Sequence, residues 1–86
     1  MPIMPSLYFH VEDAPLVRKA LDLIGKDLLK DWPFTPPNIY MTTNGNQCIV
    51  GFSWGEKEID INEKYEDADR IDAYIKGFIS GARSPQ

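Results

Sequence analysis

Hydrophobic and polar residues alternate in four short stretches of the chain, which is the pattern of half-buried β-strands. The stretches cover residues 7–11, 39–43, 47–54 and 58–62. Asn44-Gly45 follows the second stretch and readily adopts the positive φ angles of a type I′ turn, so we expect a β-hairpin there. The fourth stretch, with Ile59 and Ile61 inward and its acids outward, is predicted to extend the hairpin into a three-stranded antiparallel meander.

A longer segment, residues 14–31, has hydrophobic residues at helical spacing, and we predict an amphipathic α-helix there. Asp13 is a suitable N-cap for this helix. The helix is expected to end near Trp32, because Pro33 disfavours helical backbone in the residue before it.

A second helix is predicted to begin at Glu66 or Asp67 and to fade by Ser84. Its hydrophobic residues recur three or four positions apart, as one buried helical face requires. They are Ile71, Tyr74, Ile75, Phe78, Ile79 and Ala82.

The resulting order β-α-β-β-β-α predicts an α+β fold, a two-layer sandwich in which two helices cover one face of an antiparallel sheet of three to four strands. The first strand is expected to pair at an edge or beside the third. We predict a single domain over residues 1–86. The expected core includes Phe9, Leu21, Ile24, Val50, Phe52, Ile71, Tyr74, Ile75 and Phe78, with Cys48 as a packed and inert thiol.

The composition, 43% hydrophobic and 26% charged, is that of a globular domain. Cys48 is the only cysteine, which excludes an intramolecular disulfide and a zinc site built on several cysteines. The first fifteen residues lack the basic and long apolar regions of a secretory signal, and no apolar run approaches the ~18 residues of a membrane span. We therefore expect a cytoplasmic protein.

The net charge of −4 is unevenly distributed, because residues 56–72 carry −5 and the rest of the chain +1. This asymmetry argues against direct nucleic-acid binding and against anionic membranes. The six acids that we expect to contact a partner are Glu58, Asp60, Glu63, Asp67, Asp69 and Asp72.

Metal binding and catalysis find little support in this acidic stretch. Asp60-x-Asn62 begins like a calcium-binding EF-hand loop, but Tyr65 replaces the required glycine and Ile71 the terminal glutamate. His10 is the only histidine, and no phosphate-binding loop, nucleophile elbow or zinc-protease motif is present. The sequence predicts no metal, no cofactor and no enzyme, with a small enzyme or ligand binder lacking a local motif as an alternative.

Two interpretations of the acids remain. In the first, they are solvated side chains on a strand and on the first turn of the second helix, where Glu66, Asp67 and Asp69 stabilise the helix dipole. In the second, they form one continuous negative surface that docks onto a basic cleft of another protein.

The segment DADRIDAYIKGFISGAR, residues 67–83, resembles the last helix of a family of small acidic anti-CRISPR inhibitors of the type I-F surveillance complex. In that family a hairpin leads into an Asp-Ala-Asp-x-Ile-x-x-Tyr helix. The resemblance covers about a fifth of the chain and is carried by Asp67, Ala68, Asp69, Ile71, Tyr74, Ala82 and Arg83. It implies a phage-encoded blocker of a basic DNA-binding channel that acts through Asp67, Asp69 and Asp72.

Ala73, Gly77 and Gly81 recur every four residues along one flank of the second helix. Small residues let another helix approach closely, so this flank either packs against the first helix or forms a symmetric homodimer. Residues 33–37 match a proline-rich PxxP ligand, but their place between two elements favours a rigid connector.

Taken together, these features favour a non-enzymatic protein-binding module, from a phage or mobile element, that inhibits a host nucleic-acid-handling complex. The main alternative is a small structural or regulatory homo-oligomer.

Overall fold

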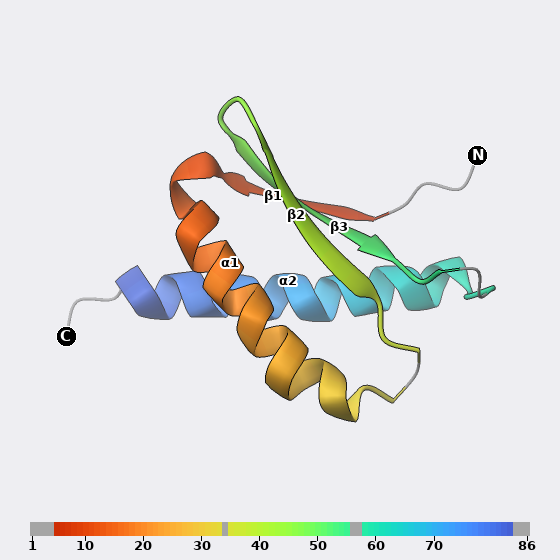
Figure 1. Ribbon diagram of the computed structural model, residues 1–86. Coiled ribbons are helices and arrows are strands. Elements are labelled where there is room, and N and C mark those ends of the chain that lie inside the picture. Colours follow the sequence, from red (N-terminus) through yellow and green to blue (C-terminus); the bar gives the residue numbers. More distant parts are fainter. Residues whose placement is uncertain (1–4, 34, 56–57, 84–86) are drawn as a thin grey trace.

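Three antiparallel strands form one sheet, and two helices cover one of its faces (Figure 1). The structure is a computed structural model that describes residues 5–33, 35–55 and 58–83. The strands are β1 (Ser6–His10), β2 (Asn38–Asn44) and β3 (Gln47–Ser53), and the main helices are α1 (Ala14–Leu23) and α2 (Ile61–Arg83). The predicted α+β class with its antiparallel sheet and two helices is confirmed.

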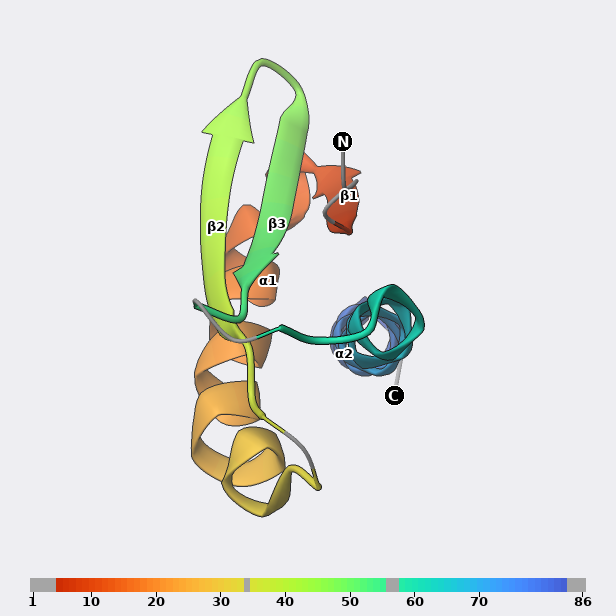
Figure 2. The ribbon, with the colours of Figure 1, turned by 90° about the vertical axis from the view of Figure 1, so that its right-hand side faces the viewer.

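The strands lie in the order β1-β3-β2, with β3 antiparallel to both neighbours. β1 and β2 therefore run parallel to each other and are joined through α1, which is a split β-α-β arrangement. β1 lies at one edge beside β3, as expected for the first strand, and β2 lies at the other edge. α1 lies on the β2 side of the sheet and α2 on the β1 side (Figure 2).

One face of the sheet points to the helices and forms the core. Across the strands, Val50 pairs with Leu7 on one side and Met41 on the other, which fixes the inward register. The inward residues are Leu7, Phe9, Ile39, Met41, Cys48, Val50 and Phe52.

The predicted core residues all belong to this cluster. Five are fully buried, namely Ile24, Val50, Phe52, Ile71 and Ile75. Four are half-buried and pack against them, namely Phe9, Leu21, Tyr74 and Phe78. Cys48 is buried as predicted.

No helix of the described residues lies over the opposite face of the sheet (Figure 1). Tyr8 and Tyr40 are 61% and 57% exposed on this face. The Tyr40 ring lies over Gly51 of the neighbouring strand, where it occupies the space of a β-carbon. Gly51 is buried because this ring covers it.

The predicted helix over residues 14–31 is confirmed, although its geometry changes along its length. α1 continues into a π-helical segment, η2 (Ile24–Leu28), and a 3₁₀ turn, η3 (Leu29–Asp31). Trp32 is extended, with ψ of 128°, so the helix ends at Asp31, next to Trp32 as predicted.

Asp13 stands at the N-cap position of α1, as predicted, but its side chain makes no capping hydrogen bond. It ends a 3₁₀ turn, η1 (Val11–Asp13), and its buried carboxylate forms an ion pair with Arg83 at the far end of α2. The pair joins the beginning of one helix to the end of the other.

The predicted hairpin is present, but its turn is shifted by one residue. Asn44 pairs with Gln47, so Gly45 and Asn46 are the central residues. Gly45 has φ of 61°, and no described residue other than glycine has a positive φ. Positive φ at the first central residue alone defines a type II′ turn rather than type I′.

The predicted strand over residues 58–62 is wrong. Residues 58–60 have no regular structure, and α2 begins at Ile61, five or six residues before the predicted start. Asp60 caps the helix, since its Oδ1 accepts a hydrogen bond of 2.8 Å from the Asn62 amide. The sequence carried a signal for this cap, because Asp60 followed by Glu63 matches the spacing of a capping box.

Candidate functional site

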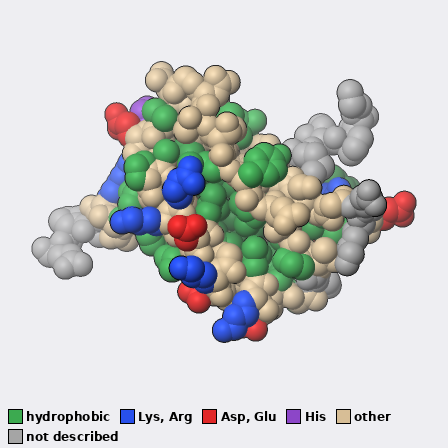
Figure 3. Space-filling model, viewed as in Figure 1, with side chains coloured by type: hydrophobic (Ala, Val, Ile, Leu, Met, Phe, Trp, Pro, Cys, Tyr) green, Lys and Arg blue, Asp and Glu red, His purple; other side chains and the backbone are tan. Residues whose placement is uncertain are grey.

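A groove of about 410 Å³ lies between the helical segment α1–η2 and the free edge of β2. The two elements run in roughly opposite directions (Figure 1). The space-filling view shows hydrophobic side chains next to the charged side chains of the helix (Figure 3).

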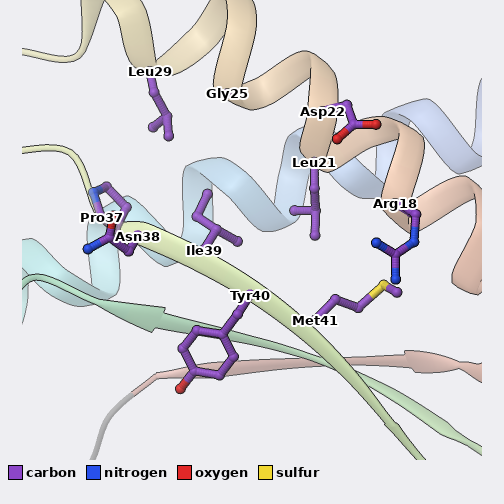
Figure 4. Close-up of a pocket in the computed structure, with 10 residues that line it drawn as sticks. All are labelled: Arg18, Leu21, Asp22, Gly25, Leu29, Pro37, Asn38, Ile39, Tyr40 and Met41. Atoms are coloured by element: carbon purple, nitrogen blue, oxygen red, sulfur yellow. The ribbon is translucent and has the colours of Figure 1, made fainter.

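Both walls supply hydrophobic side chains to the groove. Leu21 and Leu29 point from the helix toward the strand, and Ile39 points from β2 toward the helix (Figure 4). Tyr40 points away from the helix onto the open face of the sheet. The remaining lining residues are Arg18, Asp22, Gly25, Pro37, Asn38 and Met41.

The edge of β2 provides backbone hydrogen-bonding groups along the groove. Opposite residues of an antiparallel pair alternate between hydrogen-bonded and non-bonded pairs, and the pair that flanks a two-residue turn is bonded. Counting from the pair Asn44–Gln47, the alternation directs the N–H and C=O groups of Ile39, Met41 and Thr43 to the free edge.

Several of the features that prevent strand pairing at a sheet edge are absent from β2. Proteins protect sheet edges with charged residues, prolines, bulges or very short strands. β2 is seven residues long, its register with β3 is continuous, and none of its residues is charged or a proline. It is therefore a suitable template for another extended chain.

Two charged side chains lie one helical turn apart on the helix wall. Arg18 lies at the Met41 end of the groove, and Asp22 follows it toward the Leu29 end (Figure 4). Both are exposed, and within the described chain neither has an ion-pair partner.

The six acids predicted to contact a partner do not share one environment. Glu58, Asp60 and Asp69 are exposed, Glu63 and Asp72 are half-buried, and Asp67 is buried. Glu56 and Lys57 of the same stretch, and Phe34 of the proline-rich connector, lie outside the described residues.

Asp67 has a structural environment rather than a surface one. It is 3% exposed, and its Oδ2 accepts a hydrogen bond of 3.3 Å from the Trp54 indole nitrogen. Lys64 lies over the same indole ring, 5.6 Å from the centroid. The expectation that Asp67 stabilises the first helical turn is also wrong, because that turn contains Glu63.

The acids on α2 point in different directions. Asp67 and Asp69 are two residues apart, which corresponds to roughly 200° around a helix. Asp72 shares the side of Asp69, and its carboxylate pairs with Lys76 at 2.9 Å. The structure therefore divides the predicted acidic surface, and it removes Asp67 from it.

The flank formed by Ala73, Gly77 and Gly81 is exposed. A β-carbon added to either glycine meets no atom within 4 Å. The expected packing of this flank against the first helix is wrong, and a homodimer through it stays a prediction.

Cys48 is buried, whereas His10 lies at the surface. Burial raises the pKa of the Cys48 thiol, and the charge of Arg18 partly lowers it. His10 is exposed, and its Nδ1 accepts a hydrogen bond of 3.2 Å from the Glu12 amide. Among the residues that the structure describes, no group of three or more His, Cys, Asp or Glu side chains is arranged to hold a metal ion.

No helix in the described ranges combines the length and the apolar character that crossing a membrane requires. Comparison of the chain with protein-family models, curated proteins and solved structures found no match.

Sequence reasoning missed the groove. In the sequence, Arg18 and Asp22 are recognisable only as members of the polar helix face, and Met41 only as a residue of the predicted hairpin. Which strand would lie at an edge depends on the pairing of β1 with β3, and no local pattern specifies that pairing.

Proposed function

We propose that this chain is a non-enzymatic protein-binding module that receives an extended segment of a partner protein along β2. One observation carries the proposal, namely a seven-residue edge strand without charged residues or proline beside a groove with hydrophobic walls. Strand addition of this kind derives affinity from backbone hydrogen bonds and specificity from pockets for alternate side chains.

The geometry supplies both requirements. Ile39, Met41 and Thr43 direct backbone donors and acceptors to the edge. Every second side chain of an added strand would point toward the helix layer, because strand side chains alternate between the faces of a sheet. Leu21 and Leu29 would receive these side chains.

A heptapeptide library displayed on phage, selected against the full chain, tests this proposal. We expect enriched peptides to bind at micromolar concentrations and to shift the amide NMR signals of Ile39, Met41 and Thr43 in the ¹⁵N-labelled protein. Failure to enrich any peptide, or shifts confined to α2 or to the open sheet face, would overturn the proposal.

Thr43→Pro provides a matched variant for the same experiment. Proline removes the outward N–H of this exposed position and leaves the β2–β3 hydrogen bonds in place. We expect at least about a tenfold loss of affinity, since one backbone hydrogen bond and the fit of the strand are lost together. Thr43→Ala keeps the N–H and should bind as the natural chain does.

A second candidate function rests on the uneven charge of the chain and on its resemblance to the anti-CRISPR inhibitors. In this proposal the protein blocks a basic, nucleic-acid-binding surface of a host complex in the cytoplasm. The acids available for such a contact are Glu58, Asp60, Glu63, Asp69 and Asp72. Joint charge reversal of Asp69 and Asp72 should then abolish binding to a purified type I-F surveillance complex and leave the fold intact, whereas unchanged binding would exclude this use of the acids.

A further inference from the structure

We propose that the groove selects its peptide by charge, with an acidic side chain opposite Arg18 and a basic side chain opposite Asp22. This inference rests on the proposed function, because it assigns the partner chemistry of the same groove. Its starting point is that both lining residues are exposed, opposite in charge and without an ion-pair partner within the described chain.

The spacing of the two charges fits an extended peptide. Four residues of α-helix rise by about 6 Å, which separates Arg18 from Asp22 along the groove. Two residues of a β-strand span roughly 6.6 Å, and residues two apart point to the same face of a sheet. Side chains i and i+2 of an added strand therefore reach the two charges together.

Arg18 and Asp22 are poorly placed to form an ion pair with each other. Ion pairs four residues apart on a helix are stronger when the acid precedes the base, and here the base precedes the acid. The structure contains no ion pair between them. An external peptide thus meets charges that the helix itself leaves uncompensated.

The direction of β2 sets the order of the peptide. β2 runs from the Leu29 end of the groove to the Arg18 end (Figure 4). An antiparallel peptide, the more stable arrangement, enters at Arg18 and so presents its acid first. The predicted order from the N-terminus is acid, any residue, base.

The next groove-facing position of the peptide is hydrophobic. Beyond Asp22 the helix wall has Gly25, where an added β-carbon meets no atom within 4 Å. Leu29 and Ile39 flank this space. An aliphatic side chain at i+4 fills it, which completes the pattern acid-x-base-x-aliphatic.

A second copy of this chain is a poorer occupant than such a peptide. Its own β2 contains no charged residue and would leave Arg18 and Asp22 uncompensated in the interface. We therefore favour a peptide over a homodimer at this edge.

Three acetylated and amidated heptapeptides test the inference by isothermal titration calorimetry at low salt. They are Thr-Glu-Thr-Lys-Thr-Leu-Thr, the charge-swapped Thr-Lys-Thr-Glu-Thr-Leu-Thr, and the neutral Thr-Gln-Thr-Gln-Thr-Leu-Thr. We expect the first to bind about tenfold more tightly than the second, with the neutral peptide between them, because two exposed ion pairs are exchanged for two repulsive contacts.

Protein variants make the test specific to the groove. Exchange of both charges, Arg18→Asp with Asp22→Arg, should invert the preference between the two charged peptides. Lys19→Glu is the matched control for Arg18→Glu, because it changes the net charge equally on the exposed neighbouring residue outside the groove. Only Arg18→Glu should weaken binding of the first peptide.

The outcomes separate this inference from the proposed function. Equal binding of all three peptides with shifts at Ile39 and Met41 would overturn charge selection and leave strand addition standing. Tighter binding of the charge-swapped peptide would overturn the antiparallel order. A concentration-dependent dimer that Thr43→Pro abolishes would assign the edge to a second copy and overturn the peptide as occupant, and absence of all binding would overturn both proposals.

Discussion

Charge reversal at Asp67 should destabilise the protein strongly, whereas the same change two residues away should be tolerated. Asp67 is 3% exposed and accepts a hydrogen bond from the Trp54 indole, while Asp69 is exposed. Asp67→Lys and Asp69→Lys change the net charge equally, so any difference between them reports the environment of each carboxylate.

The magnitude follows from the groups that lose their partners. A hydrogen bond to a charged group contributes about 1.5–3 kcal/mol, and burial of the new lysine ammonium without a partner costs several kcal/mol more. The new ammonium would also lie near Lys64, the cation already over the Trp54 ring. For a chain of 86 residues the total stability is on the order of 4–13 kcal/mol, so Asp67→Lys removes a large part of it.

Urea unfolding followed by tryptophan fluorescence and circular dichroism measures both variants. We expect Asp69→Lys to stay within about 0.5 kcal/mol of the natural chain, as exposed substitutions do. Asp67→Asn retains an acceptor for the indole N–H and should fall between the two. Equal midpoints for Asp67→Lys and Asp69→Lys would refute the buried position of Asp67 and would restore it to the acidic surface.

Three further predictions concern the core and the sheet. Ile75→Ala should lower the free energy of unfolding by about 2–5 kcal/mol in urea titrations, because the side chain is fully buried; no change in midpoint would mean that α2 packs through another face. Gly51→Ala should cost about 1–3 kcal/mol through collision with the Tyr40 ring, and the cost should shrink in a Tyr40→Ala background; a double-mutant cycle without coupling would contradict this contact. Because burial raises the pKa of the Cys48 thiol, stability should be complete below the pKa of about 8.5 in the unfolded chain and should fall as pH rises through the higher folded value. Cys48→Ala should lack this component in unfolding curves at pH 8 and 10, and thiol reagents should label native Cys48 slowly.

The local pattern of hydrophobic residues was sufficient to predict those helices and strands whose structure depends on neighbouring residues alone. Alternation identified β1 and the β2–β3 hairpin, and helical spacing identified the helix over residues 14–31 and the buried face of α2. These signals work because period 2 and period 3.6 bury different sets of side chains. The same alternation predicted which side chains next to Val50 on its strand point inward.

Short segments with two compatible structures were decided by the tertiary fold. Residues 58–62 alternate like a strand and also match a helix entry capped by Asp60. In the structure Ile59 packs against the core while Ile61 is exposed, so the alternation did not describe burial. The helical start is the more stable one because Asp60 accepts hydrogen bonds from amides of the first turn and because α2 packs along β1.

The sequence could not predict the roles of individual carboxylates, for a related reason. Asp13, Asp67 and Asp69 have the same side chain, but the first pairs with Arg83, the second bonds to Trp54, and the third faces solvent. Those partners are far away in the chain for the first two, so only the packing of the helices on the sheet brings them together.

The sequence by itself determined the elements, their apolar faces and the α+β class, because each depends on residues a few positions apart. Only the tertiary structure decided that β1 pairs with β3, and this pairing leaves β2 at the edge beside α1. The groove with Arg18 and Asp22 exists for that reason alone, since it lies between two elements whose relative position depends on contacts distant in the chain.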